Sequence, residues 1–462
     1  MRHQHQRLIV FACLLFASLA STARAQTAAS AAWLDAYREP ASQLIAASTA
    51  STFAWNRLAQ LTDTIGHRLS GSPALDRAIK WAIAEMTRDG LENVHTEPVM
   101  IPRWVRGKES ADILAPAPHA IAMLGLGDSV GTGSTAIQAD VLVVQSMADL
   151  DARKDLAKGR IVVFNVPFTT YDETRPVRTD GPSLAAADGA VAALVRSIGP
   201  PGLRLPHTGS VSYRAGAPKI PAAAIATEDA DRLQRMADRG DRITIRLQMD
   251  AHFEADVPSA NVVAELRGRE RPDEVVVLGG HLDSWDVGAG ASDDGGGCIA
   301  AWDALRLMRT LGLRPRRTIR VVLWVNEENG TRGGIAYRDQ HRAELAKHVM
   351  MLEADSGLFS PVSFGFNGNN KGMATATAIA SLLAPIGADH VMIGGEEADI
   401  DPSIQAGHMP SMSYDGTGMY FQIHHTQADT VDKIAPADVS RAAAAMAVMT
   451  YVVADMPTRL GE

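Results

Sequence analysis

The chain has 462 residues, of which 46% are hydrophobic, 21% charged and 5% aromatic, and its formal net charge is −9. Its 39 glycines and 23 prolines are near average usage, which excludes collagen-like, low-complexity and largely disordered proteins. The acidic balance, without any block of like charges, excludes the basic surface that binds nucleic acid or an anionic membrane. Because one hydrophobic core rarely serves more than about 250–300 residues, we expect two domains or one domain with a large insertion.

The N-terminal segment 1–25 has the three parts of a secretory signal peptide. Arg2 and Arg7 precede the apolar run LIVFACLLFASLA, and an A-x-A cleavage site follows at residues 23–25. The run is too short to span a bilayer comfortably, so we expect export to the periplasm or the medium and no membrane span after cleavage. Cleavage would leave Cys298 as the only cysteine, and we therefore expect no internal disulfide.

Beyond this segment, the spacing of apolar residues predicts two helices, over 31–48 and 73–89. From about residue 110 to 254 the pattern changes to short β-type runs separated by loops rich in Gly and Pro. These runs are Val141–Val144, Ile161–Phe164 and Ile243–Met249, with a long loop over Val166–Pro182 and a helical patch over Leu184–Val195.

From about residue 259 onward, strands rich in Val, Leu and Ile alternate with helices. The predicted strands are NVVAELRG, EVVVLGGHLD, RTIRVVLWVNEE and HVMMLEAD, and the predicted helices cover 298–311, 335–347, 374–383 and 437–456. Near-continuous apolar strands require a sheet that is covered on both faces. The strand–helix–strand order therefore predicts an α/β fold with a mainly parallel sheet and helices on both faces.

Histidines and carboxylates follow the ends of these strands, where open α/β sheets place their ligands. They are His281 and Asp283 after the first central strand, Asp293 and Asp294 in the loop that follows, Glu327 and Glu328 after the next strand, Asp355 at the end of the third, and His424, His425 and Asp429 far downstream. Each motif by itself also fits an ordinary polar loop or turn. Their joint occurrence at one edge of a sheet favours a functional site.

Such a set suits two divalent cations, because imidazole and carboxylate bind zinc and one carboxylate can bridge two ions about 3.5–4 Å apart. The adjacent acids Glu327 and Glu328 can divide their roles, one binding metal and the other acting as a general base toward water. Asp283 lies two residues after His281, and Asp429 lies four residues after His425. Either carboxylate could orient the neighbouring imidazole, as outer carboxylates do in metal sites.

The motifs GGHLDSWDVGAGASDDGGG, NEENG, LEADSG and HHTQADT resemble the ligand motifs of the co-catalytic zinc aminopeptidases. More narrowly they are similar to the carboxypeptidase Q (plasma glutamate carboxypeptidase) branch, and the similarity runs from about residue 51 to 436. The resemblance implies a zinc exopeptidase fold over 26–110 and 255–462. It also implies that the β-rich region 111–254 is an inserted protease-associated domain, either a lid or packing module or a part of the substrate site.

The resemblance also implies a role for each matching residue. His281 and Asp355 would bind one zinc ion, Glu328 and His425 the other, and Asp293 would bridge them, with Glu327 as general base and Asp283 as the orienting acid. The family spacing selects Asp293 over Asp294 and His425 over His424. Many relatives carry a Tyr immediately before the last histidine ligand, to stabilise the oxyanion. Because His424 stands there in this chain, His424 and Tyr420 both remain candidates for the oxyanion donor.

The segment 396–413 resembles the wall of the family's substrate pocket, so Asp399 and Ser403 are candidates to face the substrate. The resemblance implies two Zn²⁺ ions per chain, small unblocked peptides as substrates with a leaning toward dipeptides, and a homodimer. Two alternatives stay open: a single-zinc acyltransferase of the glutaminyl cyclase type, and a non-catalytic receptor-like ectodomain. The complete set of five ligands argues against both.

Overall fold

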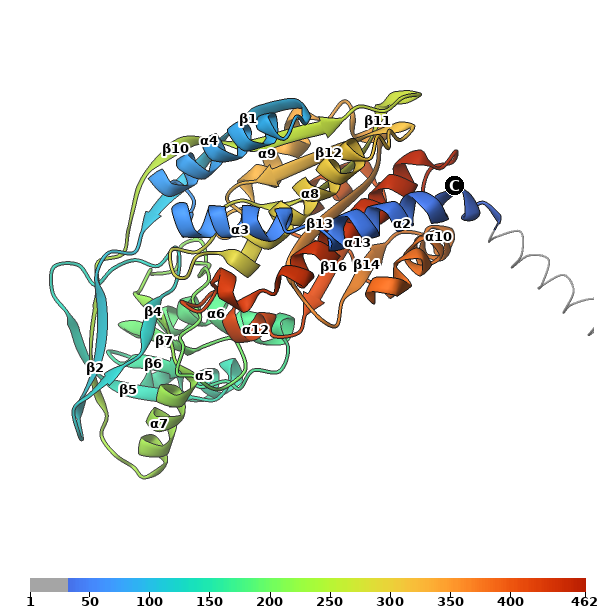
Figure 1. Ribbon diagram of the computed structural model, residues 1–462. Coiled ribbons are helices and arrows are strands. Elements are labelled where there is room, and N and C mark those ends of the chain that lie inside the picture. The colour runs from blue at the N-terminus through green and yellow to red at the C-terminus, as the bar shows by residue number, and fades with distance from the viewer. Residues whose placement is uncertain (1–31) are drawn as a thin grey trace, which may run out of the picture.

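The computed structural model describes residues 32–462, so the predicted signal peptide lies outside the described residues. The described chain forms two eight-stranded sheets. The first belongs to the upper part of the molecule in Figure 1, and the second, with its own helices, to the lower left part.

The first sheet has the strand order β1-β10-β12-β11-β13-β16-β14-β15. Its strands are β1 (Glu92–Val105), β10 (His252–Leu266), β11 (Arg271–His281), β12 (Arg317–Trp324), β13 (His348–Phe359), β14 (Ser363–Asn367), β15 (Val391–Ile393) and β16 (Ser411–Thr417). The four central strands β12, β11, β13 and β16 are parallel. Antiparallel pairs flank them. On one side β10 pairs with β12 and with β1, where the chain returns after building the second sheet, and on the other side β14 pairs with β16.

Helices cover both faces of the first sheet, which confirms the predicted α/β fold. One face packs against α2 (Asp35–Thr49), α3 (Phe53–Thr64), α4 (Pro73–Arg88), α8 (Gly296–Thr310) and α13 (Pro436–Asp455) in the main hydrophobic core. The other face packs against α9 (Arg332–Gln340) and α11 (Asp401–Gly407). Beside β14 lies α10 (Asn370–Ala380). Of these helices, α13 is long and apolar enough to cross a membrane, but 83% of its apolar window is buried, which identifies it as a core helix.

The second sheet has the strand order β3-β2-β9-β5-β6-β7-β8-β4. Its strands are β2 (Glu109–Ala115), β3 (His119–Ile121), β4 (Met123–Gly125), β5 (Ile137–Val144), β6 (Ile161–Phe164), β7 (Ala192–Arg196), β8 (Ala222–Ile225) and β9 (Thr244–Met249). Its helices are α5 (Met147–Ala152), α6 (Tyr171–Ala187) and α7 (Thr227–Asp238).

The structure overturns the predicted loop over 166–182, most of which lies in α6. The side chain of Thr170 caps this helix by accepting a hydrogen bond from the amide of Glu173, and one side of the helix is buried. The cap and the buried side outweigh the cost of the two prolines inside the helix, about 3 kcal/mol each in an isolated helix. The predicted helical patch over 184–195 is divided between the end of α6 and the buried strand β7.

Candidate functional site

The predicted ligands converge at one edge of the first sheet. They lie at the end of β11 (His281), in the loop after β12 (Glu327 and Glu328), in β13 (Asp355), in the turn η2 (Ala291–Gly295) before α8 (Asp293), and after α12 (Tyr420–Ile423), where His425 follows. Because the parallel strands end at the same edge, residues far apart in the sequence meet there.

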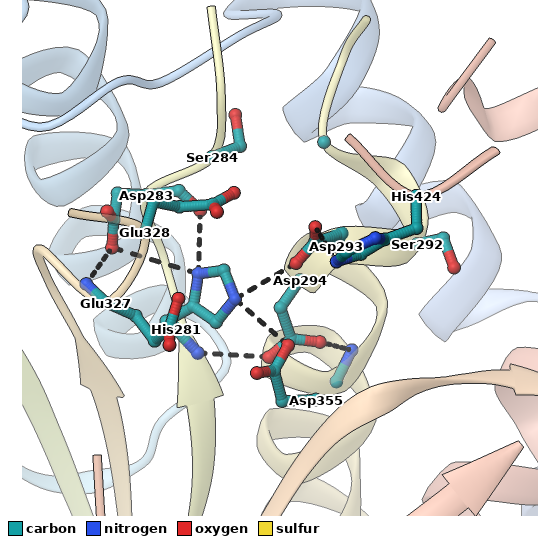
Figure 2. Close-up of polar contacts among 12 residues, drawn as sticks. His281, Asp283, Ser284, Ser292, Asp293, Asp294, Glu327, Glu328, Asp355 and His424 are labelled. Carbon is teal, nitrogen blue, oxygen red and sulfur yellow. Dashed lines mark hydrogen bonds and ion pairs between the residues drawn. The ribbon is translucent and has the colours of Figure 1, made fainter. Parts of the chain in front are cut away.

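Asp293 lies between two pairs of potential ligands. The Nε2 atom of His281 is 3.2 Å from Asp293 Oδ1 and 3.0 Å from Asp355 Oδ1, and Figure 2 shows this imidazole facing both carboxylates. On the other side, the Nε2 atom of His425 is 3.2 Å from Asp293 Oδ2 and 3.1 Å from Glu328 Oε2. The two oxygens of one carboxylate thus face two separate histidine–carboxylate pairs.

These residues fit a pair of metal ions. Two ligands about 2.0–2.1 Å from one ion in tetrahedral geometry lie roughly 3.3 Å apart, close to the observed separations. The Asp293 Oδ2 atom is buried and has no hydrogen-bond partner among the described residues, as expected of an oxygen that binds a metal ion.

Repulsion among the buried carboxylates also favours cations. Burial raises the pKa of Glu327 well above its usual range, and the nearby Asp355 and Glu328 carboxylates raise it further. Burial and then repulsion from Asp293 raise the pKa of Glu328 to about 7. Burial also raises the pKa of Asp355. Divalent cations would stabilise the ionised forms of these acids.

Asp294, the neighbour of Asp293, has a different role. Its carboxylate accepts hydrogen bonds from the backbone amides of His281 and Gly297, each at 3.0 Å. It therefore ties the end of β11 to the start of α8, while Asp293 faces the two histidines.

Asp283 contacts both the predicted ligand and the predicted base. Its backbone carbonyl lies 3.0 Å from His281 Nδ1, nearer than its carboxylate at 3.8 Å. The carboxylate accepts hydrogen bonds from the Glu327 amide at 3.2 Å and from the Ser70 hydroxyl at 2.8 Å. Asp283 thus orients His281 mainly through its backbone and holds the loop of Glu327 through its side chain.

The structure places Asp429 elsewhere than the spacing suggests. Its carboxylate accepts the backbone amides of Ala291, Ser292 and Asp293 at 2.7–3.2 Å, so it holds the turn that carries Asp293. The φ angle of His425 is 60°, which turns the chain so that the Nδ1 atom of His425 faces the backbone carbonyl of Thr208, at 3.4 Å. Thr208 belongs to the region of the second sheet, and no motif indicated it.

The two oxyanion candidates differ in their partners. The hydroxyl of Tyr420 donates a hydrogen bond to the backbone carbonyl of Asp355, at 3.1 Å. His424 stacks on His425 with ring centroids 3.6 Å apart, and its Nε2 atom is 3.6 Å from Asp293 Oδ2. Its Nδ1 atom is buried without a hydrogen-bond partner in residues 32–462. Of the two, His424 has the uncommitted ring nitrogen.

A cavity of about 800 Å³ opens over this site. Besides Asp293, Glu327, Glu328, Asp355 and His425, one wall consists of Thr170, Tyr171, Asp172, Arg175, Arg178 and Ser210 from the region of the second sheet, and another wall includes Ser356, Glu396, Glu397 and Asp401. Asp399 and Ser403 are not among the lining residues. Both side chains are fully buried behind the wall, where Asp399 accepts a hydrogen bond from the Gly334 amide at 3.2 Å.

A buried chain of hydrogen bonds connects Asp283 to the second region. The side-chain nitrogen Nδ2 of Asn326 donates to Ser70 Oγ at 3.1 Å and to Asn329 Oδ1 at 2.7 Å. The Ser70 hydroxyl in turn donates to the carboxylate of Asp283. Asn329 in turn donates to the carboxylate of Asp128, at 3.1 Å. Sequence reasoning missed these residues, although Asn326 and Asn329 flank the two glutamates in the NEENG motif.

Comparisons with known proteins show the family of this chain. The model of peptidase family M28 matches residues 261–450. The chain is 46% identical to carboxypeptidase Q of Mus musculus over 88% of this chain and 86% of that protein, and 43% identical to carboxypeptidase Q of Xenopus laevis over 92% of each.

Solved structures agree in fold. The crystal structure of a peptidase M28 precursor from Shewanella amazonensis matches with a TM-score of 0.89 at 33% identity, covering 93% of this chain and 99% of that one. A zinc aminopeptidase from Bacillus subtilis shares the fold, with a TM-score of 0.66 at 19% identity over 87% and 94% of the two chains. The chain therefore belongs to peptidase family M28 and is similar to carboxypeptidase Q over most of its length.

Proposed function

We propose that the chain, a zinc-dependent metallo-exopeptidase by its family, uses two zinc ions to hydrolyse small peptides with a free amino group. The observation that carries the proposal is the position of Asp293, whose two oxygens face His281 with Asp355 and His425 with Glu328. These five residues would hold the ions. Ions bound there would polarise the scissile carbonyl and acidify the attacking water.

Glu327 is the proposed general base. It lines the cavity, and its backbone amide is fixed by Asp283, so its carboxylate is held beside the two ligand pairs. It takes a proton from the attacking water and delivers it to the leaving amine. His424, which lines the cavity, is the proposed donor to the oxyanion, whereas the hydroxyl of Tyr420 donates to the backbone carbonyl of Asp355.

The free amino group of the substrate would meet the acidic wall. Glu396, Glu397 and Asp401 line the cavity there, whereas the predicted Asp399 and Ser403 are buried behind it. An ammonium group is stabilised by such carboxylates, and an acetylated nitrogen is not. The wall therefore favours unblocked peptides.

Export, a protease-associated role for 111–254, and a homodimer remain proposals that the family resemblance supports. N-terminal sequencing of the secreted protein tests cleavage after residue 25. Light scattering of the purified protein at micromolar concentration tests the dimer.

The central test is hydrolysis of one dipeptide, free or N-acetylated, by the mature protein together with a measurement of zinc content. We expect two zinc ions per chain and cleavage of the free form alone. Cleavage of the acetylated form alone would overturn the amino-group requirement. One zinc ion per chain with no hydrolysis would favour the cyclase alternative.

A further inference from the structure

Arg178, a buried cation in the wall of the cavity, has no counter-ion among the described residues. It lies in α6 and is 3% exposed. Its two hydrogen bonds go to neutral oxygens, the Thr208 carbonyl at 3.1 Å and the Tyr171 hydroxyl at 2.9 Å, and its Nε atom has no partner in residues 32–462. A buried charge without an opposite charge is costly, so an anion is expected to complete this site.

The space around the guanidinium is preserved by a glycine. Gly209 has a φ angle of 120°, and a Cβ atom added there would overlap the guanidinium of Arg178. On another side, the guanidinium lies over the ring of Tyr171, 5.5 Å from its centroid. The backbone and Tyr171 together hold the cation in place rather than leaving it on a flexible surface side chain.

The cation is close to the proposed zinc site. Arg178 Nη1 and His425 Nδ1 both face the same Thr208 carbonyl, at 3.1 and 3.4 Å. The ring of Tyr171 lies edge-on to His424, with centroids 5.1 Å apart. The Thr208 carbonyl thus lies between the guanidinium and His425, and the Tyr171 ring lies between the guanidinium and His424.

Charge is divided unequally around the cavity. The proposed metal site and the wall with Glu396 and Glu397 are acidic, whereas the α6 wall carries one carboxylate, Asp172, and two cations, Arg175 and Arg178, three positions apart in the helix. Residues three apart in a helix lie on the same side. No carboxylate pairs with Arg175 within residues 32–462 either.

We propose that Arg178, with Arg175 at the rim, binds the C-terminal carboxylate of the substrate and so makes α6 the element that selects dipeptides. The inference rests on the proposed function. A residue in an extended peptide spans about 3.3–3.6 Å, so the length of a peptide sets whether its carboxylate meets Arg178 while its amino group meets the acidic wall. A peptide of another length would leave the buried cation unpaired.

The test compares a dipeptide with its C-terminal amide, both with free amino groups, in the wild type and in R178Q. We expect the wild type to prefer the free acid by about 10- to 150-fold in kcat/KM, the range that a hydrogen-bonded charge contributes, mainly through KM. In R178Q this ratio should fall to about one. R175Q should lower it only a few-fold, because Arg175 is exposed.

Two controls separate specificity from structure. R235Q makes the same change at an exposed position of α7 that does not line the cavity, and it should keep the wild-type ratio. Arg178 donates to the Thr208 carbonyl, which also faces His425. Zinc content and the urea midpoint of R178Q therefore show whether loss of this hydrogen bond has disturbed the metal site or the fold. If R178Q loses activity on acid and amide equally, with the ratio intact, Arg178 is a positioning residue and the proposal is overturned.

The wild-type measurement alone can also overturn the proposal, even if R178Q does not fold. Equal cleavage of acid and amide by a zinc-loaded wild type would refute the carboxylate subsite but leave the peptidase function standing. Cleavage of neither form by that protein would instead refute the proposed function.

Discussion

The two walls of the cavity differ in origin and in how the sequence encodes them. The acidic side includes residues that follow strand ends of the first sheet in short motifs such as NEENG and LEADSG, together with Glu396, Glu397 and Asp401, which lie outside those motifs. The basic side is built from α6 and the segment around Thr208, which carry no motif. The predicted ligands therefore lie in local sequence motifs, whereas the wall that contains Arg178 forms by packing between distant segments.

The largest effect is expected from D293A. This change removes the carboxylate that faces both histidine–carboxylate pairs, so zinc content should fall from two ions per chain to less than one and hydrolysis should become undetectable. Metal analysis after dialysis, together with the dipeptide assay, checks this. Retention of two zinc ions with measurable turnover would show that the two pairs do not depend on Asp293.

E327Q should separate catalysis from metal binding on the same side of the cavity. The amide cannot accept the proton of water, so kcat should fall by about 10²–10⁴-fold while zinc content stays at the wild-type value. Turnover near the wild-type rate would refute Glu327 as the base, and simultaneous loss of zinc would place it among the ligands.

The contact between the two regions should give an intermediate effect. Ser70 donates to Asp283, and Asp128 reaches the same network through Asn329. S70A should lower kcat about 10- to 100-fold, as loss of outer hydrogen-bond partners does in metal sites, and D128A should lower it less because it lies farther along the chain of bonds. Zinc content, KM and kcat measured together check this order. A larger loss in D128A than in S70A would contradict transmission through Asn329.

Strong local patterns made much of the first sheet and its site predictable. The apolar strands, the core helices and the ligand motifs were readable because each is a continuous segment whose residues act together. Asp429 was harder to place: a spacing of four residues suggested that it contacts His425, but the positive φ angle of His425 turns the chain and Asp429 binds the η2 turn instead.

The second region was less predictable because its burial depends on distant contacts. β7 and β8 contain the alanine-rich runs AALVR and AAAI, which favour a helix locally, yet both strands are fully buried in the sheet. α6 contains two prolines and reads as a loop, yet its Tyr171 stacks on Phe421 at 5.5 Å. Contacts of this kind cannot be inferred from one segment alone.

The smallest effect is expected far from both walls, at His348. This residue is 2% exposed; its Nδ1–H donates to the Glu344 carbonyl at 3.1 Å, so its Nε2 accepts from the Tyr337 hydroxyl at 2.9 Å. Burial, assisted by the cations of its surroundings, lowers the pKa of His348 to about 4 from the usual 6.5. The folded protein therefore holds this imidazole neutral.

Because the pKa of His348 is lower in the folded chain than in the unfolded chain, the stability of the protein decreases at acidic pH. Between about pH 6.5 and pH 4 the unfolded chain binds a proton at His348 and the folded chain does not, so stability falls as the pH is lowered, by up to about 1.4 kcal/mol per pH unit from this residue. H348N should reduce that slope in urea unfolding at pH 7, 6 and 5, and it should leave dipeptide hydrolysis at pH 7 unchanged, because His348 lies outside the cavity. An unchanged slope would mean that His348 is protonated in the folded protein. A change in hydrolysis would mean that the packing around His348 affects the residues of the cavity.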